Sequence, residues 1–272
     1  MRKHWPVTIA LVLIAVAVAA PFFYMISVSF MGETELLRWP PALLPHAPTT
    51  ANYVAAFGAL PYGRVVINTA LVAGCVMLGQ VLTSAGAGYA FARMRFPGRD
   101  GLLALLLATL AIPAILLVIP RFVLMTALGW VDTYPGLIST ELVSVAGILL
   151  MRQAFRTMPR EVEEAARLDG AGEWTLFWRV MLPLARPAVL TVAVLAFLDQ
   201  WRSFLWPLVI TRSAEMQVAE VALAGLHKTY LANWPYQMAA ATLVTLPVLL
   251  VGLLGQGYLL RGLRTTGAEL RS

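Results

Sequence analysis

The chain has 272 residues, of which 60% are hydrophobic and 12% are charged, and its mean hydropathy is +0.76. A soluble globular domain has roughly 45–50% apolar and about 25% charged residues, so most of this chain is expected to have lipid as its solvent. The formal net charge of +6 does not indicate nucleic-acid binding, because the basic residues lie between apolar runs and are interpreted as determinants of membrane topology.

Six apolar stretches are each near the roughly 20 residues that a helix needs to cross a bilayer. They therefore predict an all-α integral membrane protein that forms a single transmembrane domain over residues 1–272. In chain order the stretches cover residues 7–30, 65–91, 102–125, 137–151, 187–210 and 237–260.

The first stretch follows Arg2 and Lys3 and carries no charge. Its segment AVAVAA resembles a signal-peptide cleavage region, but the apolar core of a signal peptide has only about 7–15 residues. This stretch is longer, so a retained helix is predicted. In the third stretch, Pro113 and Pro120 predict kinks, because proline removes a backbone hydrogen bond within a helix.

The basic residues give the chain an orientation. If the N-terminus is inside, 14 of the 20 Lys and Arg residues fall on the inner side and 6 on the outer side. Loops on the cytoplasmic side carry the excess of Lys and Arg, so both termini and the loop between the fourth and fifth stretches are predicted to be cytoplasmic. The six outer residues are Arg38, Arg64, Arg121, Arg202, Arg212 and Lys228.

The outer loops are longer than simple turns. Residues 32–64 include the proline-rich segment RWPPALLPHAP and are expected to be irregular. Residues 211–236 include AEMQVAEVALAGLHKTY, which predicts a short amphipathic helix at the outer face.

The most polar segment is the 159–183 loop, with the sequence PREVEEAARLDGAGEWTLFWRVMLP. Seven residues from Arg160 to Glu173 are charged, and burying them at the bilayer centre would cost about 20 kcal/mol, so the loop is expected to lie outside the membrane. Its pattern predicts a helix, a turn at Gly170 and a second helix. The second helix carries an aromatic and methionine stripe, consisting of Trp174, Phe177, Trp178 and Met181.

This loop resembles the EAA loop of ABC-importer permeases, which has the pattern Glu-Ala-Ala, three residues, Gly, nine residues, then an aliphatic residue, any residue, Leu and Pro. Val180 stands where isoleucine is usual. The segment GYAFARMRFPGR resembles the exit of helix 2 in carbohydrate-uptake permeases, specifically the maltose-permease G-like subunits. The segment FLDQWRSFLWPLVI resembles their helix 5 signature, with Arg202 and Ser203 in place of the usual polar pair. The matching EAA positions are Glu164, Ala165, Ala166, Gly170, Val180, Leu182 and Pro183.

The resemblance implies a type I ABC-importer permease fold with six helices, in which the EAA loop is the coupling helix for an ATPase. It implies a heterodimer with a second related permease, an ATPase dimer that holds ATP and Mg, and an extracytoplasmic solute-binding protein. The chain would lie in a bacterial or archaeal plasma membrane, in contact with lipid and without nucleic acid. The residues expected to bind the ATPase are Glu163, Glu164, Ala165, Ala166, Arg167, Leu168, Asp169, Gly170 and Ala171.

Ionisable residues within the apolar stretches form a second candidate site, because such residues usually line a cavity or a pathway. Asp199 and Arg202 are three residues apart, so they share a helix face and can pair. An ion pair between subunits explains them equally well, and Glu141 suits an interface or a helix cap. The residues expected along a substrate pathway are Glu141, Asp199, Gln200, Trp201, Arg202 and Trp206.

Two further classes of function remain open at this point: an intramembrane enzyme that uses Asp199 or Glu141 as acid or base, and a secondary transporter gated by these carboxylates. Neither needs an EAA loop. The chain lacks the nucleotide-binding motif G-x-x-x-x-G-K-[ST], so no cofactor is expected on it. The single cysteine, Cys75, is expected to be a small buried apolar residue.

Overall fold

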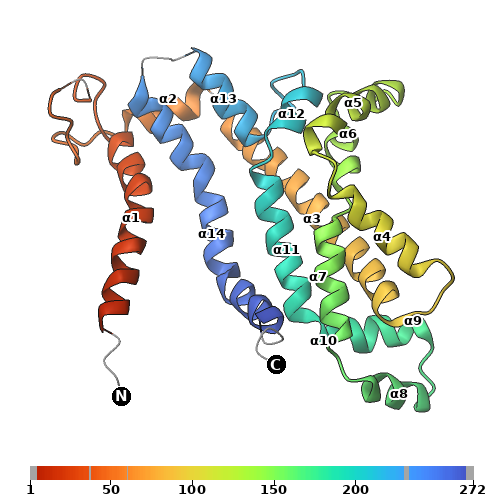
Figure 1. Ribbon diagram of the computed structural model, residues 1–272. Coiled ribbons are helices and arrows are strands. Elements are labelled where there is room, and N and C mark those ends of the chain that lie inside the picture. The colour runs from red at the N-terminus through yellow and green to blue at the C-terminus, as the bar shows by residue number, and fades with distance from the viewer. Residues whose placement is uncertain (1–4, 37, 60, 230–232, 268–272) are drawn as a thin grey trace. The chain divides into compact units, whose positions relative to one another are not determined.

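The computed structural model describes residues 5–36, 38–59, 61–229 and 233–267, and within these ranges the regular structure is helical (Figure 1). The side chains of Arg2, Lys3, Lys228, Arg261, Arg264 and Arg271, which enter the charge count above, lie outside the described part. The elements are α1 (Trp5–Ser29), α2 (Ala51–Ala59), α3 (Tyr62–Arg93), α4 (Arg99–Thr109), η1 (Ala114–Leu117), α5 (Val118–Ala127), α6 (Tyr134–Ile138), η2 (Ser139–Glu141), α7 (Val145–Arg156), α8 (Arg160–Leu168), α9 (Glu173–Thr175), the π-helix η3 (Leu176–Met181), α10 (Leu182–Leu184), α11 (Arg186–Trp201), α12 (Leu205–Ile210), α13 (Ala219–Thr229) and α14 (Trp234–Gly267).

Three helices are long and apolar enough to cross a membrane by themselves: α1, α3 and the first 24 residues of α14. Three further pairs of helices pass the same test only when each pair is taken as one bent span. These pairs are Arg99–Thr109 with Ala114–Ala127, bent by 95°, Tyr134–Glu141 with Val145–Arg156, bent by 46°, and Glu173–Leu184 with Arg186–Trp201, bent by 77°. The described helices therefore supply between three and six spans.

The bent pairs differ from the continuous helices expected from the sequence, except in the third stretch, where kinks at Pro113 and Pro120 were predicted. The helix in the stretch 102–125 breaks just before Pro113, because proline disfavours helical backbone in the residue before it. Pro113 itself has extended backbone and precedes η1. Pro120 lies in the first turn of α5, where its missing N–H costs no helix bond. The stretch 137–151 contains the end of α6, η2 and most of α7, and 187–210 is divided between α11 and α12.

One compact unit comprises residues 1–66 and 219–247. Its core joins α2, α13 and the start of α14 through Ala56, Leu226, Tyr236 and Ala240, and the Tyr62 hydroxyl donates to the Leu243 carbonyl at 2.6 Å. The helix expected within 211–236 is confirmed as α13. The expectation that all of 32–64 is irregular is wrong for α2, whose sequence ANYVAAFGA is proline-free and rich in alanine.

The other unit comprises residues 67–218 and 248–272. Within it α7 packs against α11, and against α3 at Gly88, where an added Cβ would lie 2.6 Å from Met151 Cβ. Glycine has no Cβ, so at Gly88 it permits this close approach of the two helices. Cys75 on α3 is exposed, so its expected burial is wrong; an apolar side chain needs no burial within the protein where lipid surrounds it.

Candidate functional site

The 159–183 loop forms a helix, a left-handed turn and a second helix. α8 ends at Leu168, and Gly170 has φ 82°. The Gly170 N–H donates to the Arg167 carbonyl and the Ala171 N–H to the Ala166 carbonyl, both at 3.0 Å. This pair of bonds is the Schellman arrangement, which satisfies the last carbonyls of a helix and favours glycine at the left-handed position. The predicted turn at Gly170 is therefore confirmed.

The second helix contains a π-helical segment, η3, between α9 and α10. The Leu182 N–H donates to the Phe177 carbonyl, five residues earlier, and the next residue, Pro183, has no N–H to donate. A local π-turn accommodates this missing donor without ending the helix. The chain then bends at Ala185 and enters α11.

The two faces of α8 have different environments. Val162, Glu163 and Ala166 are half-buried against the chain's own helices, and Ala166 packs on the cluster that contains Phe155 and Phe177. The opposite face is open, and Leu168 is 90% exposed. The exposed members of the predicted ATPase-binding set are Glu164, Ala165, Arg167, Leu168, Asp169 and Gly170.

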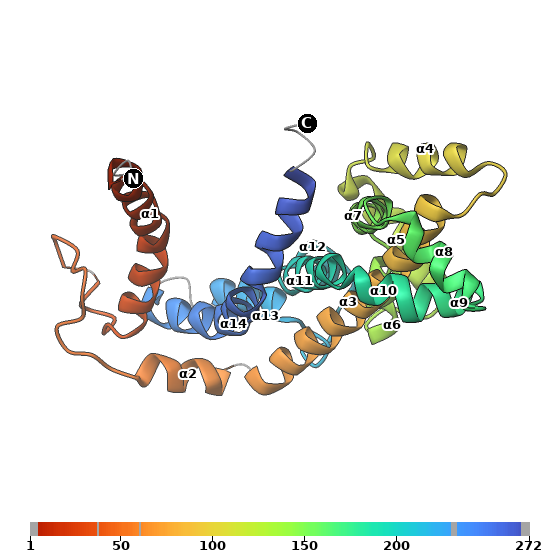
Figure 2. The ribbon, with the colours of Figure 1, turned by 90° about the horizontal axis from the view of Figure 1, so that it is seen from below.

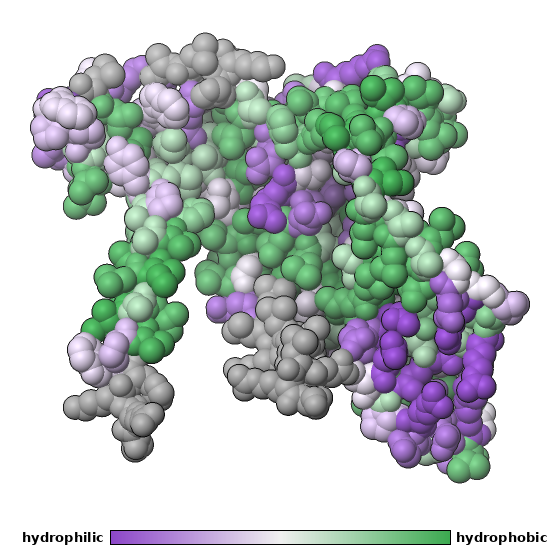
Figure 3. Space-filling view, in the orientation of Figure 1, coloured by the Kyte–Doolittle hydropathy of each residue, from purple (hydrophilic) through white to green (hydrophobic). Residues whose placement is uncertain are grey.

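Two ion pairs involve residues of the loop. The carboxylate of Glu163 lies 3.0 Å from Nε of Arg93, the last residue of α3. The carboxylate of Glu173 lies 2.8 Å from the guanidinium of Arg167, so it joins the two helices across the Gly170 turn. Figures 1 and 2 show α8 and α9 at the same end of α3, and Figure 3 shows hydrophilic side chains gathered over that end.

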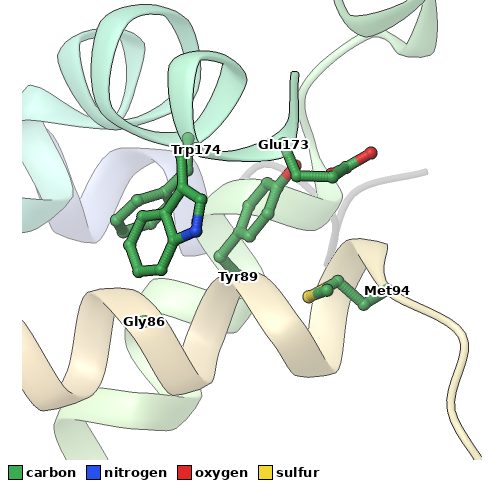
Figure 4. A pocket seen from close by; sticks show the side chains of 6 residues that line it. Gly86, Tyr89, Met94, Glu173 and Trp174 are labelled. Atoms are coloured by element: carbon green, nitrogen blue, oxygen red, sulfur yellow. The ribbon is translucent and has the colours of Figure 1, made fainter.

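The predicted aromatic stripe on the second helix divides between core and surface. Phe177 and Met181 are buried, and Phe177 contacts Tyr89 of α3 at a ring distance of 5.2 Å. Trp174 is 77% exposed, and an apolar pocket of about 260 Å³ lies between it and α3 (Figure 4). The stripe therefore attaches the loop to the chain through only two of its four members.

The intramembrane candidates are not brought together at one place. Asp199 and Arg202 line a hollow of about 320 Å³ together with Gln80 and Ser144. The expected Asp199–Arg202 pair is absent from the described ion pairs; Arg202 Nε instead donates to the Leu198 carbonyl at 3.2 Å. The hollow therefore presents a carboxylate, a guanidinium, an amide and a hydroxyl.

Gln200 and Trp201 lie beside these residues in the sequence but are buried. The Gln200 Nε2 has no hydrogen-bond partner among the described residues. Trp201 packs its ring 5.5 Å from that of Phe197 on α11. These two side chains thus face the protein rather than line the hollow.

Glu141 and Trp206 belong to a separate cluster around Arg121. The guanidinium of Arg121 pairs with Glu141 and donates to Thr140, and it lies 4.2 Å above the ring of Trp206. The Trp206 indole donates to the Gly136 carbonyl at 3.1 Å. This cluster joins α5, η2, α6 and α12.

The sequence analysis assigned no individual role to Arg93 or Arg121. Both were used only in the count of basic residues that predicts the membrane orientation. Arg93 and Glu163 are 70 positions apart, so no local spacing connects them. Arg121 offered a weak signal, since it is a charge within an apolar stretch and such charges are usually paired. In the described residues no group of three His, Cys, Asp or Glu side chains is placed to hold a metal ion.

Comparison with known proteins identifies the family. Residues 81–265 match the model of the binding-protein-dependent transport system inner membrane component. The arabinooligosaccharides transport system permease protein of Halalkalibacterium halodurans is 32% identical, over 97% of this chain and 96% of that protein. The sn-glycerol-3-phosphate transport system permease protein of Agrobacterium fabrum is also 32% identical, over 94% of each chain.

The fold also matches a solved structure. The crystal structure of a bacterial ABC transporter involved in the import of the acidic polysaccharide alginate gives a TM-score of 0.81 at 24% identity, over 95% of this chain and 98% of that chain. The family model covers more than half of the sequence, and it describes a transport component rather than an enzyme. The chain therefore belongs to the family of binding-protein-dependent transport system inner membrane components, the multi-pass permeases of ABC importers.

Proposed function

We propose that the chain forms one half of the translocation pathway for a sugar or a sugar-like solute and that its 159–183 loop receives a separate ATPase. The observation that carries the proposal is the geometry of α8. Its inner face is fixed to the chain, whereas small Ala165 lies between exposed Glu164 and Leu168 on the outer face. A small side chain between larger exposed ones permits close approach of a partner surface.

The partners follow from the family and from what the chain lacks. A binding-protein-dependent system needs a solute-binding protein, and a chain without a nucleotide-binding motif needs a partner to hold ATP and Mg. We propose that a second, related permease completes the pathway. In this arrangement the termini and the 159–183 loop face the cytoplasm, as the distribution of basic residues favours.

The hollow beside Asp199 and Arg202 supports a polar solute. Its carboxylate, guanidinium, amide and hydroxyl offer both donors and acceptors for hydroxyl groups. The two named relatives concern arabinooligosaccharides and sn-glycerol-3-phosphate, which are both rich in hydroxyl groups. We propose that Asp199 and Arg202 border the solute route.

The test of ATPase docking compares matched substitutions at two positions. Gly170→Val should disrupt the turn, because a β-branched residue is strained at φ 82°, whereas Gly170→Asn should keep it, since asparagine tolerates this conformation. Ala165→Trp should block the partner and Ala165→Ser should not. Each variant is purified with its partner permease, and co-eluting ATPase and binding-protein-stimulated hydrolysis are measured.

We expect docking and stimulated hydrolysis to fall together in the valine and tryptophan variants and to persist in the other two. Normal docking in all four variants would contradict the proposal. The solute class is tested by reconstituting the chain with its partners and comparing the uptake of oligosaccharides with that of sugar phosphates. Uptake of neither class would contradict the sugar-like assignment.

A further inference from the structure

The guanidinium of Arg93 joins three helices at one point. Arg93 is the last residue of α3. Its Nε and Nη2 donate to the Phe155 carbonyl at 2.9 and 2.5 Å, and Nη2 also donates to the Met158 carbonyl. Phe155 lies in the last turn of α7, where carbonyls have no partner within the helix. The same guanidinium contacts Glu163 of α8, and the two side chains are 8% and 12% exposed.

The two attachments at Arg93 differ in kind. The N–H groups of Arg93 point at the carbonyls at the end of α7, so α3 and α7 are joined by directional bonds. The Glu163 Oε1 lies 3.0 Å from Nε but receives no aligned hydrogen bond among the described residues. The contact of α8 with Arg93 is therefore one of charge rather than of an aligned hydrogen bond. The Coulomb energy of two charges depends on the distance between them and not on an angle, so the attraction persists when the angle between the groups changes.

The position of Glu163 also separates attachment from docking. The sequence alone placed Glu163 among the residues expected to bind the ATPase, but its side chain is only 12% exposed and lies on the inner face of α8. Glu164, Ala165 and Leu168 are exposed on the outer face. A partner on the outer face thus need not touch Glu163. If that partner displaces α8, the contact between Glu163 and Arg93 moves the ends of α3 and α7 with it. The packing of Ala166 on the Phe155 cluster is a second contact between α8 and these helices.

From this geometry we propose that Arg93 and Glu163 are positioning residues that transmit the movement of α8 to α3 and α7. The inference rests on the proposed function, since it requires an ATPase at the outer face of α8. It predicts that the loss of the charge on Glu163 separates ATP hydrolysis from transport while the ATPase still binds.

The second ion pair of the same loop provides a matched control. Arg167 and Glu173 are 2.8 Å apart, but both side chains are 53% exposed. Exposed pairs are screened by water and contribute little. Glu173→Gln therefore makes the same chemical change as Glu163→Gln, on the same loop, without altering the buried contact with Arg93.

The experiment uses the complete transporter in proteoliposomes. Co-eluting ATPase, basal hydrolysis and solute transported per ATP hydrolysed are measured for Glu163→Gln, Glu163→Asp and Glu173→Gln. We expect Glu163→Gln to retain ATPase and basal hydrolysis but to transport at least about fivefold less solute per ATP, the lower end of typical coupling between sites. Glu163→Asp keeps the charge at a longer distance and should be intermediate. Glu173→Gln should match the unmodified transporter.

Each other outcome counts against the proposal. If Glu163→Gln transports as much solute per ATP as the unmodified protein, the contact transmits nothing. If it loses the bound ATPase together with transport, Glu163 serves docking or folding instead. If ATPase fails to co-elute with the unmodified chain, the proposed function fails first, and that measurement distinguishes the two failures.

Discussion

Three glycines on α3 test how closely this helix approaches its neighbours. Replacing any helical glycine by alanine should stabilise the helix by about 1 kcal/mol, because alanine has less backbone freedom to lose on folding. The differences between the three variants then depend on what the new Cβ meets. At Gly86 it meets nothing within 4 Å; at Gly79 it meets the Cδ2 of Leu142 at 2.4 Å; at Gly88 it meets Met151 Cβ at 2.6 Å and the backbone N of Arg152 at 2.8 Å.

These contacts predict an order of stability. Gly86→Ala should gain about 1 kcal/mol in free energy of unfolding. At Gly79 the clash is with the end of a flexible side chain, which can rotate away, so part of the gain should remain. At Gly88 the clash is with Cβ and backbone, and overpacking of this kind costs roughly 1–3 kcal/mol. Gly86→Ala should therefore exceed Gly88→Ala by about 1–3 kcal/mol.

The assay is thermal inactivation of each purified variant in detergent. Samples are heated in steps, and the fraction that stays monodisperse is measured by size-exclusion chromatography. In domains of 150–250 residues 1 kcal/mol corresponds to about 2–4 °C, so the two extreme variants should differ by several degrees. If Gly88→Ala is as stable as Gly86→Ala, then α3 and α7 do not approach as closely as described.

Three further predictions concern solute transport, topology and pH. Asp199→Asn should lower uptake while the complex still assembles, because it removes the only carboxylate that lines the hollow among the described residues. Glu173→Cys, in a Cys75→Ser background, should resist an impermeant thiol reagent outside intact cells and react after permeabilisation. Burial of the Asp132 carboxyl opposes ionisation, but hydrogen bonds from the N–H groups of Arg212 and Ser213 outweigh it and lower its pKa. The stability that the ionised Asp132 carboxylate provides should thus be fully present above about pH 4 and should be lost as the pH falls further.

Each of these has a control. A fully active Asp199→Ala variant would remove this residue from the solute route. Leu44→Cys, 74% exposed in the loop before α2, should react from outside if Glu173→Cys does not, and the opposite pattern would reverse the orientation. Asp132 has φ 61°, which asparagine tolerates, so Asp132→Asn removes the charge alone. Its stability deficit should shrink below about pH 4, and a deficit independent of pH would contradict the assignment.

The parts of the fold predicted from sequence are those with local signals. Gly170 followed a run of charged and small residues, and the turn with φ 82° lies there. Apolar length alone identified α1, α3 and α14. The breaks inside the other stretches were harder to predict, because Pro113 interrupts its stretch whereas Pro21 and Pro247 remain inside continuous helices. Only the packing around each proline decides between these outcomes.

In the candidate site, too, local features could be predicted from the sequence and tertiary contacts could not. The open face of α8 could be predicted because its residues are adjacent in sequence. The attachment of α8 through Arg93 could not, since the partners of Arg93 lie on α7 (Phe155), in the segment after α7 (Met158) and on α8 (Glu163). Likewise Glu141 was recognised as a charge in an apolar stretch, but its partner Arg121 lies on α5 and is set by tertiary packing.

Exposed apolar side chains have different explanations in different parts of this chain. On α1, leucines and valines are exposed within a helix that carries no charge in its described residues, and lipid is a sufficient solvent for them. Leu168 is 90% exposed but lies among Glu164, Arg167 and Asp169. Placing this segment in lipid would cost about 2.5–3.5 kcal/mol for each charge at the bilayer centre, far more than burying one leucine returns. Leu168 is therefore available to a protein surface, and the partner that we propose for the outer face of α8 is the ATPase.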